Sequence, residues 1–595
     1  MKRITAILLS VCILIALAGC VKVTTTTVTH RVRANNTATD SSSQATSPDN
    51  AGSDMENTDS SKGSSDSVTS SEAVIRTDNG DVDLTVKQAA VFNGARREES
   101  GYALYYVDSE NGDDENDGRT ERSAWKTLDN VNNRTFEPGT KIMLKCGSVF
   151  DQMLVPRSSG TAGKYFIIDS YGKGAKPIIN GDGEAQAVLI SSLQYIEIRN
   201  LEIRNPSEYS ASRKGVAVYA GGQVSSGVFH EGGVFNHIYL INLDVIDVSC
   251  TDGQRFYGGI VFYSRQSKSP TSFNEILVQG CTIKNTGGSG IAMASDYEHG
   301  PGVEWSAFEY TPSTNATFRN NFVSHCASDG IFISAVKGLL IESNTVTDTS
   351  YAEGAYAGIW PHYSSNVVMQ YNEAYDVKLV GGDGQGYDVD IDCVNTKVQY
   401  NYSHDNEGGF ILLCTDGTNG GYNKDISVRY NISQNDKSQI FTLSGPISDV
   451  KIYNNTVYTK AGLKTNLVGS YDWGTAASPK NVRFTNNIFN MNSTGWCSLI
   501  IPSRITFDTN LFYGTYGFAQ LFQSGVKING SLTEDPMFVN PGAGGIGLDT
   551  LGGYRLKSSS PAINSGKWIS QCGGRDFYGK AVTKEGLPDL GAIEY

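Results

Sequence analysis

Residues 370–404, QYNEAYDVKLVGGDGQGYDVDIDCVNTKVQYNYSH, contain one structural unit of this chain and the start of the next. A short strand pattern around Asn372 is followed 29 residues later by a similar pattern around Asn401. Between them lies a glycine-led segment, Gly386 to Asp390, in which apolar and acidic residues alternate. Alternation of this kind is typical of a β-strand with one buried face. The stretch therefore predicts a unit of several short strands joined by tight turns.

The same Asn-centred pattern recurs through most of the chain. From Asn321 onward, the spacing between consecutive copies runs from 23 to 32 residues. A unit of this length indicates a solenoid, and strands of three to five residues fit a right-handed parallel β-helix. A repeated Asn at one turn would form a ladder in which each side-chain amide bonds the next coil. The copies are centred on Asn200, Asn242, Asn321, Asn344, Asn372, Asn401, Asn431, Asn455, Asn487 and Asn510.

The glycine-led strands of successive units can be aligned with one another. Because strand side chains alternate between two faces, the apolar first position after the lead residue is expected to face the interior. These first positions are Ile260, Ile291, Ile331, Ile359, Tyr387, Phe410 and Ile440. The second positions are then expected to face outward, and they are Val261, Ala292, Phe332, Trp360, Asp388, Ile411 and Phe441. The fourth positions share that outward face, and they are Tyr263, Ala294, Ser334, His362, Asp390, Leu413 and Leu443.

The composition supports an all-β fold and argues against some partners. Of 595 residues, 65 are Gly and 31 are Tyr, whereas only 39% are hydrophobic. Gly tolerates the positive φ angles of tight turns, and a helical bundle would need more Ala, Leu, Glu and Lys. The formal net charge of −14 argues against nucleic acid as a partner, because phosphate binding needs clustered Lys and Arg.

The N-terminus carries the features of an export signal. Two basic residues precede a largely apolar run, residues 4–17, that is short for a membrane span. The run ends in Leu17-Ala-Gly-Cys20, which resembles a bacterial lipobox. The resemblance implies that residues 1–20 are a lipoprotein signal peptide, cleaved before Cys20, and that Cys20 carries a lipid. An uncleaved anchor is the alternative. In both cases the rest of the chain is expected to be extracytoplasmic and held at the bacterial cell membrane.

The remainder divides into four segments. Residues 21–97 are rich in Ser and Thr, which fill 14 of the 30 positions from 41 to 70, so this stretch is expected to be a disordered tether. Residues 98–188 are expected to form an N-terminal cap and the first coils, and residues 189–524 the right-handed parallel β-helix. Residues 525–595 are expected to form an irregular C-terminal closing segment. The wide cysteine spacing argues against a zinc site and leaves the disulfide state open.

The unit quoted first also carries the strongest candidate site. Asp388, Asp390 and Asp392 alternate with apolar residues, so their carboxylates are expected on one outward face. Residues two apart on a strand lie about 6.5–7 Å apart, which is within the range of carboxylate separations used in glycoside hydrolysis. Three anions this close either share a proton or hold a cation. For the cation, Asp388 and Asp392 are the candidate ligands and Ca²⁺ is the implied ion. A solvated acidic strand is the alternative.

Neighbouring coils supply further candidates. Trp360 and His362 precede the aspartates by one coil and are expected beside them, about 4.8 Å away. Trp360 would stack on a sugar ring, and His362 would contact a hydroxyl group. Glu407, just before the next glycine-led strand, is the expected catalytic acid. Asp405 and Asp416, on either side of that strand, are the other candidates for substrate binding.

Three stretches carry a resemblance to a known family. They are the opening Tyr105-Tyr-Val-Asp108, the Asn-centred coils, and the ending Pro588-Asp-Leu-Gly-Ala-Ile-Glu594. Together they resemble secreted bacterial right-handed β-helix proteins of the pectate-lyase-like superfamily, over roughly residues 100–595. The superfamily contains polysaccharide lyases, glycoside hydrolases, epimerases and non-catalytic adhesins, so the fold does not choose between them.

The residues at the aligned strand position favour a hydrolase. The resemblance implies that a calcium-dependent lyase would typically use a Lys base on this strand, where the chain has Asp390. The β-helix glycoside hydrolases place an Asp there as nucleophile, similar to Asp390. Their acid/base residue, one coil later, would fall near Leu413, which cannot serve. Glu407 or Asp416 would have to substitute.

The sequence therefore predicts a surface-tethered, polysaccharide-degrading enzyme, and most simply a glycoside hydrolase acting on plant or microbial polysaccharide. Asp390 is the expected nucleophile or base, with Asp388 setting its protonation and Glu407 as the acid. A calcium-dependent pectate-type lyase is the first alternative, and a non-catalytic glycan-binding or adhesive β-helix is the second. The expected partners are an oligosaccharide or polysaccharide and, through the lipid on Cys20, the membrane. A monomer is expected.

Overall fold

The computed structural model describes residues 100–207, 211–225, 228–251, 253–298, 309–417, 421–472 and 478–595. The expected signal peptide, the tether and the lipidation site Cys20 lie outside the described residues. Within the described ranges, no helix has the length and apolar content needed to cross a membrane.

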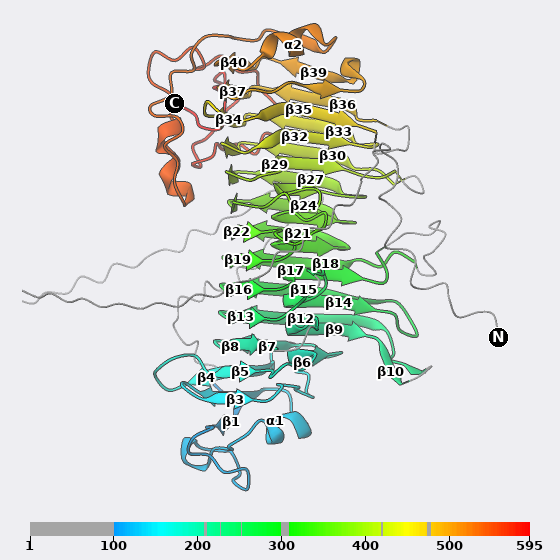
Figure 1. Ribbon diagram of the computed structural model, residues 1–595. Coiled ribbons are helices and arrows are strands. Elements are labelled where there is room, and N and C mark those ends of the chain that lie inside the picture. Colours follow the sequence, from blue (N-terminus) through cyan, green and yellow to red (C-terminus); the bar gives the residue numbers. More distant parts are fainter. Residues whose placement is uncertain are drawn as a thin grey trace, which may run out of the picture. The chain divides into compact units, whose positions relative to one another are not determined.

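The described chain forms a parallel β-helix built from three long sheets (Figure 1). Successive strands pass from sheet A to sheet B to sheet C, so each complete coil adds one strand to each sheet. Neighbouring coils pair in parallel, as the strands of two adjacent coils show in all three sheets. This arrangement confirms the all-β solenoid that the 23- to 32-residue spacing predicted.

The strands of the three sheets follow one another in the order of the coils. Sheet A contains β1 (Ala103–Val107), β2 (Thr140–Lys145), β4 (Phe166–Tyr171), β7 (Ile196–Arg199), β12 (Gly233–Ile241), β15 (Thr271–Gln279), β18 (Ser313–Arg319), β21 (Val336–Glu342), β24 (Ser365–Gln370), β27 (Val394–Gln399), β30 (Lys424–Arg429), β33 (Ser448–Tyr453), β36 (Lys480–Thr485), β39 (Ile505–Asp508) and β41 (Lys527–Asn529). Sheet B contains β3 (Val149–Asp151), β5 (Ile178–Asn180), β8 (Glu202–Asn205), β13 (Asp244–Val248), β16 (Thr282–Thr286), β19 (Phe322–Cys326), β22 (Thr345–Thr349), β25 (Glu373–Tyr375), β28 (Tyr402–His404), β31 (Ile432–Gln434), β34 (Thr456–Thr459), β37 (Ile488–Met491) and β40 (Leu511–Tyr513). Sheet C contains β6 (Gln186–Ser191), β9 (Lys214–Gly221), β14 (Gly258–Arg265), β17 (Ser289–Ser295), β20 (Ile331–Ser334), β23 (Ile359–His362), β26 (Gln385–Val389), β29 (Gly409–Cys414), β32 (Ser438–Ser444), β35 (Thr465–Tyr471) and β38 (Ser498–Leu499).

The few other elements lie at the ends of the solenoid and on one insertion. The antiparallel hairpin of β10 (Gln223–Ser225) and β11 (Val228–Phe229) follows β9. A short helix, α1 (Asp129–Asn133), lies near the first coil, and α2 (Phe518–Gln523) lies near the last (Figure 1). The apolar core runs between the sheets from one end to the other. All eight cysteines of the described residues are free thiols.

The asparagine ladder runs through eight coils on the turn between sheets A and B. Asn401 is fully buried, and its Nδ2 donates to Oδ1 of Asn431 at 3.0 Å and to the carbonyl of Met369 at 2.9 Å. Its Oδ1 accepts the backbone N–H and the Nδ2 of Asn372, at 2.9 and 3.0 Å. Each amide is therefore satisfied on both sides, which fixes the register of neighbouring coils. The members are Asn321, Asn344, Asn372, Asn401, Asn431, Asn455, Asn487 and Asn510.

Two of the expected members are not in the ladder. Asn200 and Asn242 occupy the position before it, where the backbone is left-handed with φ of 56° and 54°. They bond each other at 2.7 Å on an exposed surface. The ladder position itself holds Leu201 and Leu243 in these coils, and both are fully buried. The prediction is therefore right from Asn321 onward and wrong by one residue in the earlier coils.

The expected alignment of sheet C holds as far as β26 and slips by one residue after it. Ile359 pairs with Tyr387 as predicted, but Tyr387 pairs with Ile411 instead of Phe410. The reason is that Gly409 pairs with Gln385, so the two lead glycines do not lie in register. The outward assignment of the following residues is therefore wrong, because all of them lie in the core: Ile411, Leu413, Phe441 and Leu443.

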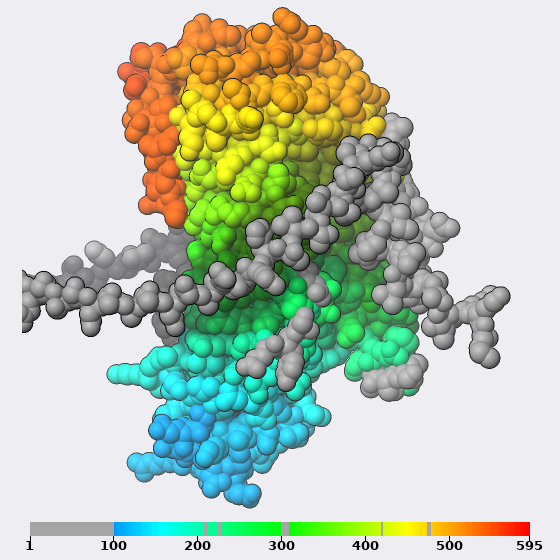
Figure 2. Space-filling view, in the orientation of Figure 1, coloured from blue at the N-terminus to red at the C-terminus, as the bar shows by residue number. Residues whose placement is uncertain are grey.

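The C-terminal segment closes the molecule along its side. Figure 2 shows it, in orange and red, lying along the coils. Buried residues of this segment, such as Leu551 and Leu590, form a second apolar cluster with Tyr402, Tyr430 and other residues of sheet B and its flanking turn. The segment is irregular, as predicted, and the longest helix in it is a 3₁₀ helix (Leu548–Tyr554).

We expect Asn401→Ala to destabilise the protein by about 3–5 kcal/mol in chemical denaturation. The change leaves donors of Asn372 and acceptors on Asn431 and Met369 unpaired in a dry interior. Asn481→Ala is the matched control, because Asn481 bonds Asp449 on an exposed corner. Its effect should stay within about 0.5 kcal/mol. Equal losses for the two variants would contradict the role given to the ladder.

Candidate functional site

Five neighbouring strands of sheet C, from β17 to β29, present the candidate site on their outward face. Phe332 and Trp360 pair across β20 and β23, and Asp388 follows on β26. Asp388 is only 1% exposed. Asp390, directly after the end of β26, is partly exposed. One carboxyl therefore lies beneath the surface and the other lies at it.

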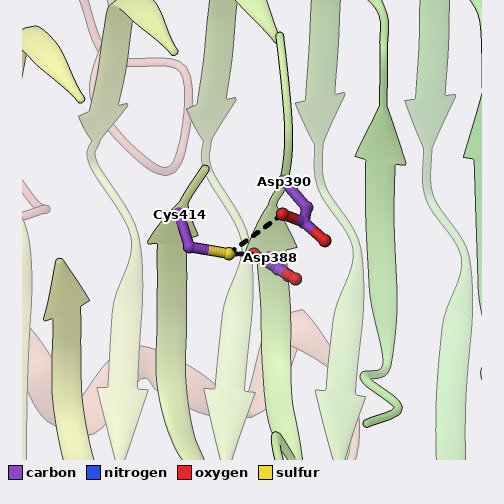
Figure 3. Close-up of side chains that lie close together, drawn as sticks. All are labelled: Asp388, Asp390 and Cys414. Carbon is purple, nitrogen blue, oxygen red and sulfur yellow. Dashed lines mark hydrogen bonds between the residues drawn. The ribbon is translucent and has the colours of Figure 1, made fainter. Parts of the chain in front are cut away.

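Cys414, at the end of β29, faces both carboxylates (Figure 3). Its thiol donates a hydrogen bond to Oδ1 of Asp390 at 3.1 Å, and its sulfur lies 3.9 Å from Oδ1 of Asp388. Burial raises the pKa of Cys414 well above its ordinary value, and the charges of the two aspartates add to this rise. The sulfur therefore keeps its proton and acts as a donor.

Cys414 stands where the sequence alignment placed Leu413. Asp388 pairs with Leu412, and Val389 pairs with Leu413, so Leu413 faces the core. The sequence analysis missed Cys414 because a slip of one residue exchanges the two faces of a strand.

The pKa values of Asp388 and Asp390 are both raised. Burial, helped by the charge of Asp390, raises the pKa of Asp388 well above its ordinary value. Burial also raises the pKa of Asp390, to about 6, although hydrogen bonds from Cys414 and from the N–H of Ile391 oppose the rise. Burial therefore disfavours the charged form of both carboxyls.

A third carboxyl, that of Asp383, acts on the same face from the glycine-rich loop before β26. Burial raises the pKa of Asp383 to about 7, the charge of Asp390 adds to the rise, and the charge of Arg255 opposes it. The loop packs closely, since a Cβ on Gly381 would lie 2.2 Å from the backbone nitrogen of Gly354. The sequence analysis missed Asp383, although an acid in a GGDG loop directly before the aspartate strand was a visible signal.

Trp360 is buried, so the prediction of an exposed stacking residue is wrong. It is 3% exposed, and its Nε1 donates to Oδ1 of Asp329 at 3.0 Å. The guanidinium group of Arg255 lies over the indole, 4.7 Å from the ring centroid. Arg255 also forms an ion pair with Asp329 at 2.6 Å. A residue on a loop of an earlier coil therefore covers the tryptophan, which lies on the outward face one strand before Asp388.

His362 lies at the rim of the site and is part of a polar chain. Its Nδ1 lies 3.1 Å from Oγ of Ser334, and this hydroxyl donates to Oε2 of Glu298 at 2.8 Å. Burial raises the pKa of Glu298 to about 7, and the charge of Asp296 adds to the rise. The contact of His362 with a substrate hydroxyl stays a prediction.

Asp392 leaves the strand, so the expected row of three carboxylates is reduced to two. Its φ of 57° is left-handed, and its Oδ1 is buried without a hydrogen-bond partner under Gly421. Burial raises the pKa of Asp392 to about 6, with the charges of Asp416 and Asp390 adding to the rise. Asp416 is partly exposed and also raises the pKa of Asp390, so it lies at this end of the site.

Glu407 lies at the other end of β29 from Cys414. Its Oε2 accepts the N–H of Leu379 at 3.1 Å, and its Oε1 lies 3.9 Å from the ammonium group of Lys437. The length of β29 corresponds to roughly 16 Å. The structure therefore does not bring Glu407 to Asp390, and the geometry does not support Glu407 as the catalytic acid.

Asp405 belongs to a different cluster, at the corner after sheet B. Its Oδ2 lies 3.0 Å from Nδ1 of His404, whose Nε2 lies 3.2 Å from Glu373. These hydrogen bonds raise the pKa of His404 to about 9, although burial alone would lower it. The structure therefore separates Asp405 from the carboxylates of sheet C.

The donor atoms at the site are a poor match for calcium. One oxygen each of Asp388 and Asp390 and the sulfur of Cys414 lie within 4.8 Å of one another. Calcium takes about six to eight oxygen ligands, and a protonated thiol does not suit it. Asp392, the expected second ligand, is absent from this group of described residues. Calcium therefore stays a prediction that this donor set does not favour.

The fold and the site define a β-helix with a carboxylate-lined outer face, and comparison with known proteins agrees with this class. The family model described as "Right handed beta helix region" matches residues 178–426. The solenoid is therefore a right-handed parallel β-helix, as the sequence predicted.

Two particular relatives are similar over much of the chain. The lacto-N-biosidase of Bifidobacterium longum subsp. longum is 28% identical over 616 residues, which cover 83% of this chain and 36% of that protein. The chain therefore spans about a third of the length of this curated relative. The crystal structure of a GH136 lacto-N-biosidase from Eubacterium ramulus is 28% identical with a TM-score of 0.53, covering 60% of this chain and 64% of that one. Its selenomethionine derivative gives a TM-score of 0.54 at 27% identity, over 67% and 68% of the two chains.

We expect Asp388→Asn to raise the melting temperature at pH 8 by roughly 1–3 °C and to change it little at pH 4.5. The folded-state pKa of Asp388 is raised, so its stabilising contribution is complete below the unfolded pKa of about 3.8 and is lost as the pH rises through the folded pKa. The amide carries no charge and avoids that loss. Thermal melts at the two pH values test this, and a lower melting temperature at pH 8 would contradict it.

Proposed function

We propose that this chain is a glycoside hydrolase whose catalytic groups are Asp390 and Asp383, on the outward face of sheet C. The observation that carries the proposal is that these two partly exposed carboxyls lie within reach of each other's charge, since the charge of Asp390 helps to raise the pKa of Asp383. Burial raises the pKa of Asp390 to about 6 and that of Asp383 to about 7. Such a pair supplies one ionised and one protonated carboxyl near neutral pH, which hydrolysis of a glycosidic bond requires.

Each residue of the site has a defined part in the proposed reaction. Asp383 holds the proton and donates it to the glycosidic oxygen while the bond from this oxygen to the anomeric carbon breaks. Asp390 is ionised, and it either bonds the anomeric carbon or removes a proton from the water that does so. The neutral carboxyl of Asp388 and the thiol of Cys414 lie against Asp390, and the thiol hydrogen bond stabilises its negative charge.

The relatives supply the substrate class of the proposal. The similar proteins from Bifidobacterium longum and Eubacterium ramulus are named lacto-N-biosidases. We therefore propose that this chain cleaves lacto-N-biosides, a substrate class that differs from the plant or microbial polysaccharide predicted from the sequence. Two features of the site support a neutral saccharide: the carboxyl groups disfavour an anion, and the polar chain of Ser334 and His362 suits hydroxyl groups.

The proposed location is the outer side of the bacterial cell membrane. The lipobox-like stretch ending at Cys20 and the Ser/Thr-rich residues 21–97 support a lipid anchor followed by a tether. Incorporation of labelled palmitate that persists in Cys20→Ala would refute the anchor. The proposed assembly is a monomer, which size-exclusion chromatography with light scattering measures.

A polysaccharide lyase remains the principal alternative, and the charges at the site favour the hydrolase. A lyase needs a base that removes a proton next to a carboxyl group of the substrate. Arg255 is the cation whose charge acts on Asp383 and Asp390, and its ion pair with Asp329 keeps its pKa above the ordinary value in spite of burial. Arg255 therefore stays protonated and cannot act as the base that a lyase needs. A non-catalytic glycan-binding protein, the second alternative, would bind sugars without turnover.

We expect a bell-shaped pH dependence of kcat/KM with its maximum between about pH 6 and 7. Activity requires ionised Asp390 and protonated Asp383, whose pKa values are about 6 and about 7. The rate is lost at low pH as Asp390 gains a proton and at high pH as Asp383 loses one. Release of p-nitrophenol from p-nitrophenyl lacto-N-bioside, read after quenching, gives the profile. Full activity at pH 9 would contradict this assignment.

We expect Asp390→Asn and Asp383→Asn each to lower kcat/KM by about a hundredfold or more while the fold is kept. Asp405→Asn is the matched control, because Asp405 lies in the separate cluster with His404 and should keep most activity. Thermal melts of all variants show whether the protein is folded. Retention of activity by a folded Asp390→Asn would refute the site, and ultraviolet absorbance of an unsaturated product would support the lyase.

A further inference from the structure

Arg255 lies on the loop before β14 and bonds residues on two later coils. Its Nε lies 2.6 Å from Oδ2 of Asp329, a fully buried residue on the loop before β20. Its Nη2 donates to the carbonyl oxygen of Ala355, on the loop before β23. The hydroxyl group of Tyr356 returns this contact by donating to the carbonyl oxygen of Gly253 at 2.7 Å. One guanidinium group therefore ties three loops of sheet C together.

Aromatic rings fix the orientation of this guanidinium group. Its central carbon lies 4.7 Å from the ring centroid of Trp360, 5.0 Å from that of Phe332 and 5.3 Å from that of Tyr356. Arginine can stack its plane on a ring while the N–H groups at its edge donate to oxygen atoms. Lysine has no such plane and cannot make both kinds of contact in this way.

The loop that Arg255 holds packs against the loop that carries Asp383. The backbone N–H of Gly384 donates to the carbonyl oxygen of Tyr356 at 2.8 Å. A Cβ on Gly382 would lie 3.2 Å from Cα of Ala355, so the two backbones are close to contact. A displacement of Ala355 or Tyr356 would therefore be passed on to Asp383.

The charge of Arg255 also acts on Asp383. Burial raises the pKa of Asp383, and the charges of Asp390 and Asp329 add to this rise, whereas the charge of Arg255 opposes it. The side chain of Arg255 is only 27% exposed, so water screens this interaction less than it would at an open surface. Arg255 therefore affects both the place and the charge of Asp383.

We propose that Arg255 is a positioning residue of the hydrolase, whose guanidinium group, held between Asp329 and the ring of Trp360, keeps the loop of Asp383 in its place on the outward face of sheet C. This inference rests on the proposed function, in which Asp383 donates the proton. A misplacement of a reacting group by about 1 Å can lower a rate about a hundredfold. Arg255 contacts the loops that surround the acid and acts on the reaction through Asp383.

The first test compares Arg255→Lys with wild type. The substrate is a lacto-N-bioside with a disaccharide as its aglycone, and chromatography measures the released disaccharide. We expect kcat to fall about tenfold or more with KM changed less than about threefold, because the lysine loses the fork of hydrogen bonds. Hydrogen–deuterium exchange should become about tenfold faster in peptides covering residues 379–386. Arg119→Gln is the matched control, because Arg119 lies 4.1 Å over the ring of Tyr105 near the first coil, and it should change neither result.

The second test compares Arg255→Gln with Arg255→Lys, since both lose the fork and only the lysine keeps the charge. We expect the alkaline limb of kcat/KM to lie higher by about 0.5 in pH for the glutamine variant, because the cation that opposes the raised pKa of Asp383 is missing. If Asp329 without its partner unfolds this variant, Arg255→Gln combined with Asp329→Asn replaces it. The direction stays the same, because Arg255 acts on Asp383 more strongly than Asp329 does. Coinciding limbs would contradict the proposal.

The outcomes separate this role from the proposed function. If wild type cleaves the substrate and folded Arg255→Lys keeps its kcat and its exchange rates, the positioning role is refuted and the hydrolase stands. If wild type does not cleave the substrate, the proposed function fails, and the exchange measurement decides about the loop. Faster exchange in residues 379–386 of folded Arg255→Lys would then support the positioning of the Asp383 loop by Arg255, and unchanged exchange would refute it.

Discussion

The register between neighbouring coils is the constraint on which the rest of this structure depends. In a parallel β-helix, a side chain on one coil has as its neighbours the residues paired with it about 4.8 Å away on the coils before and after. The buried asparagine ladder fixes that pairing, since each amide oxygen accepts two hydrogen bonds from one neighbouring coil while the amide nitrogen donates to both. A slip of one residue would leave these groups unpaired in a dry core, so the register is expensive to change.

The register also decides which side chains meet at the site, and this limits what the sequence can predict. The repeat spacing, the ladder from Asn321 onward and the outward direction of Asp388 all follow from periodicity, which the sequence displays directly. The identity of the side chain beside Asp390 does not follow from periodicity. Gly386 and Gly409 look equivalent in the sequence, yet Gly409 pairs with Gln385. This offset of one residue places Cys414 beside Asp390 and directs Leu413 into the core. Periodicity predicts which residues alternate within one coil, but it does not predict which residue of the next coil each of them pairs with.

Loops account for the other differences between the predicted and the observed site. Asp383 acts on the strand face from a glycine-rich loop, and Arg255 covers Trp360 from a loop of an earlier coil. Neither placement follows from strand alternation, because loop conformation depends on close backbone packing such as that of Gly381 against Gly354. The prediction of Glu407 as the catalytic acid is not supported for a different reason. Glu407 is close to the site in the sequence, but the length of β29 separates it from Cys414 in space.

The stacking that builds the fold also supplies the chemistry of the site. Parallel coils place outward acids and a thiol close together, and covering loops remove them from water, so burial is the largest contribution to the raised pKa of Asp383, Asp388 and Asp390. Such crowding lowers the free energy of unfolding at neutral pH. A carboxyl with a raised pKa must either take up a proton or carry a charge that its surroundings disfavour, whereas in the unfolded chain it ionises freely. The cost is local, since each coil depends mainly on its two neighbours. A solenoid whose ladder and core continue without interruption above and below the site can therefore tolerate a strained cluster in one coil.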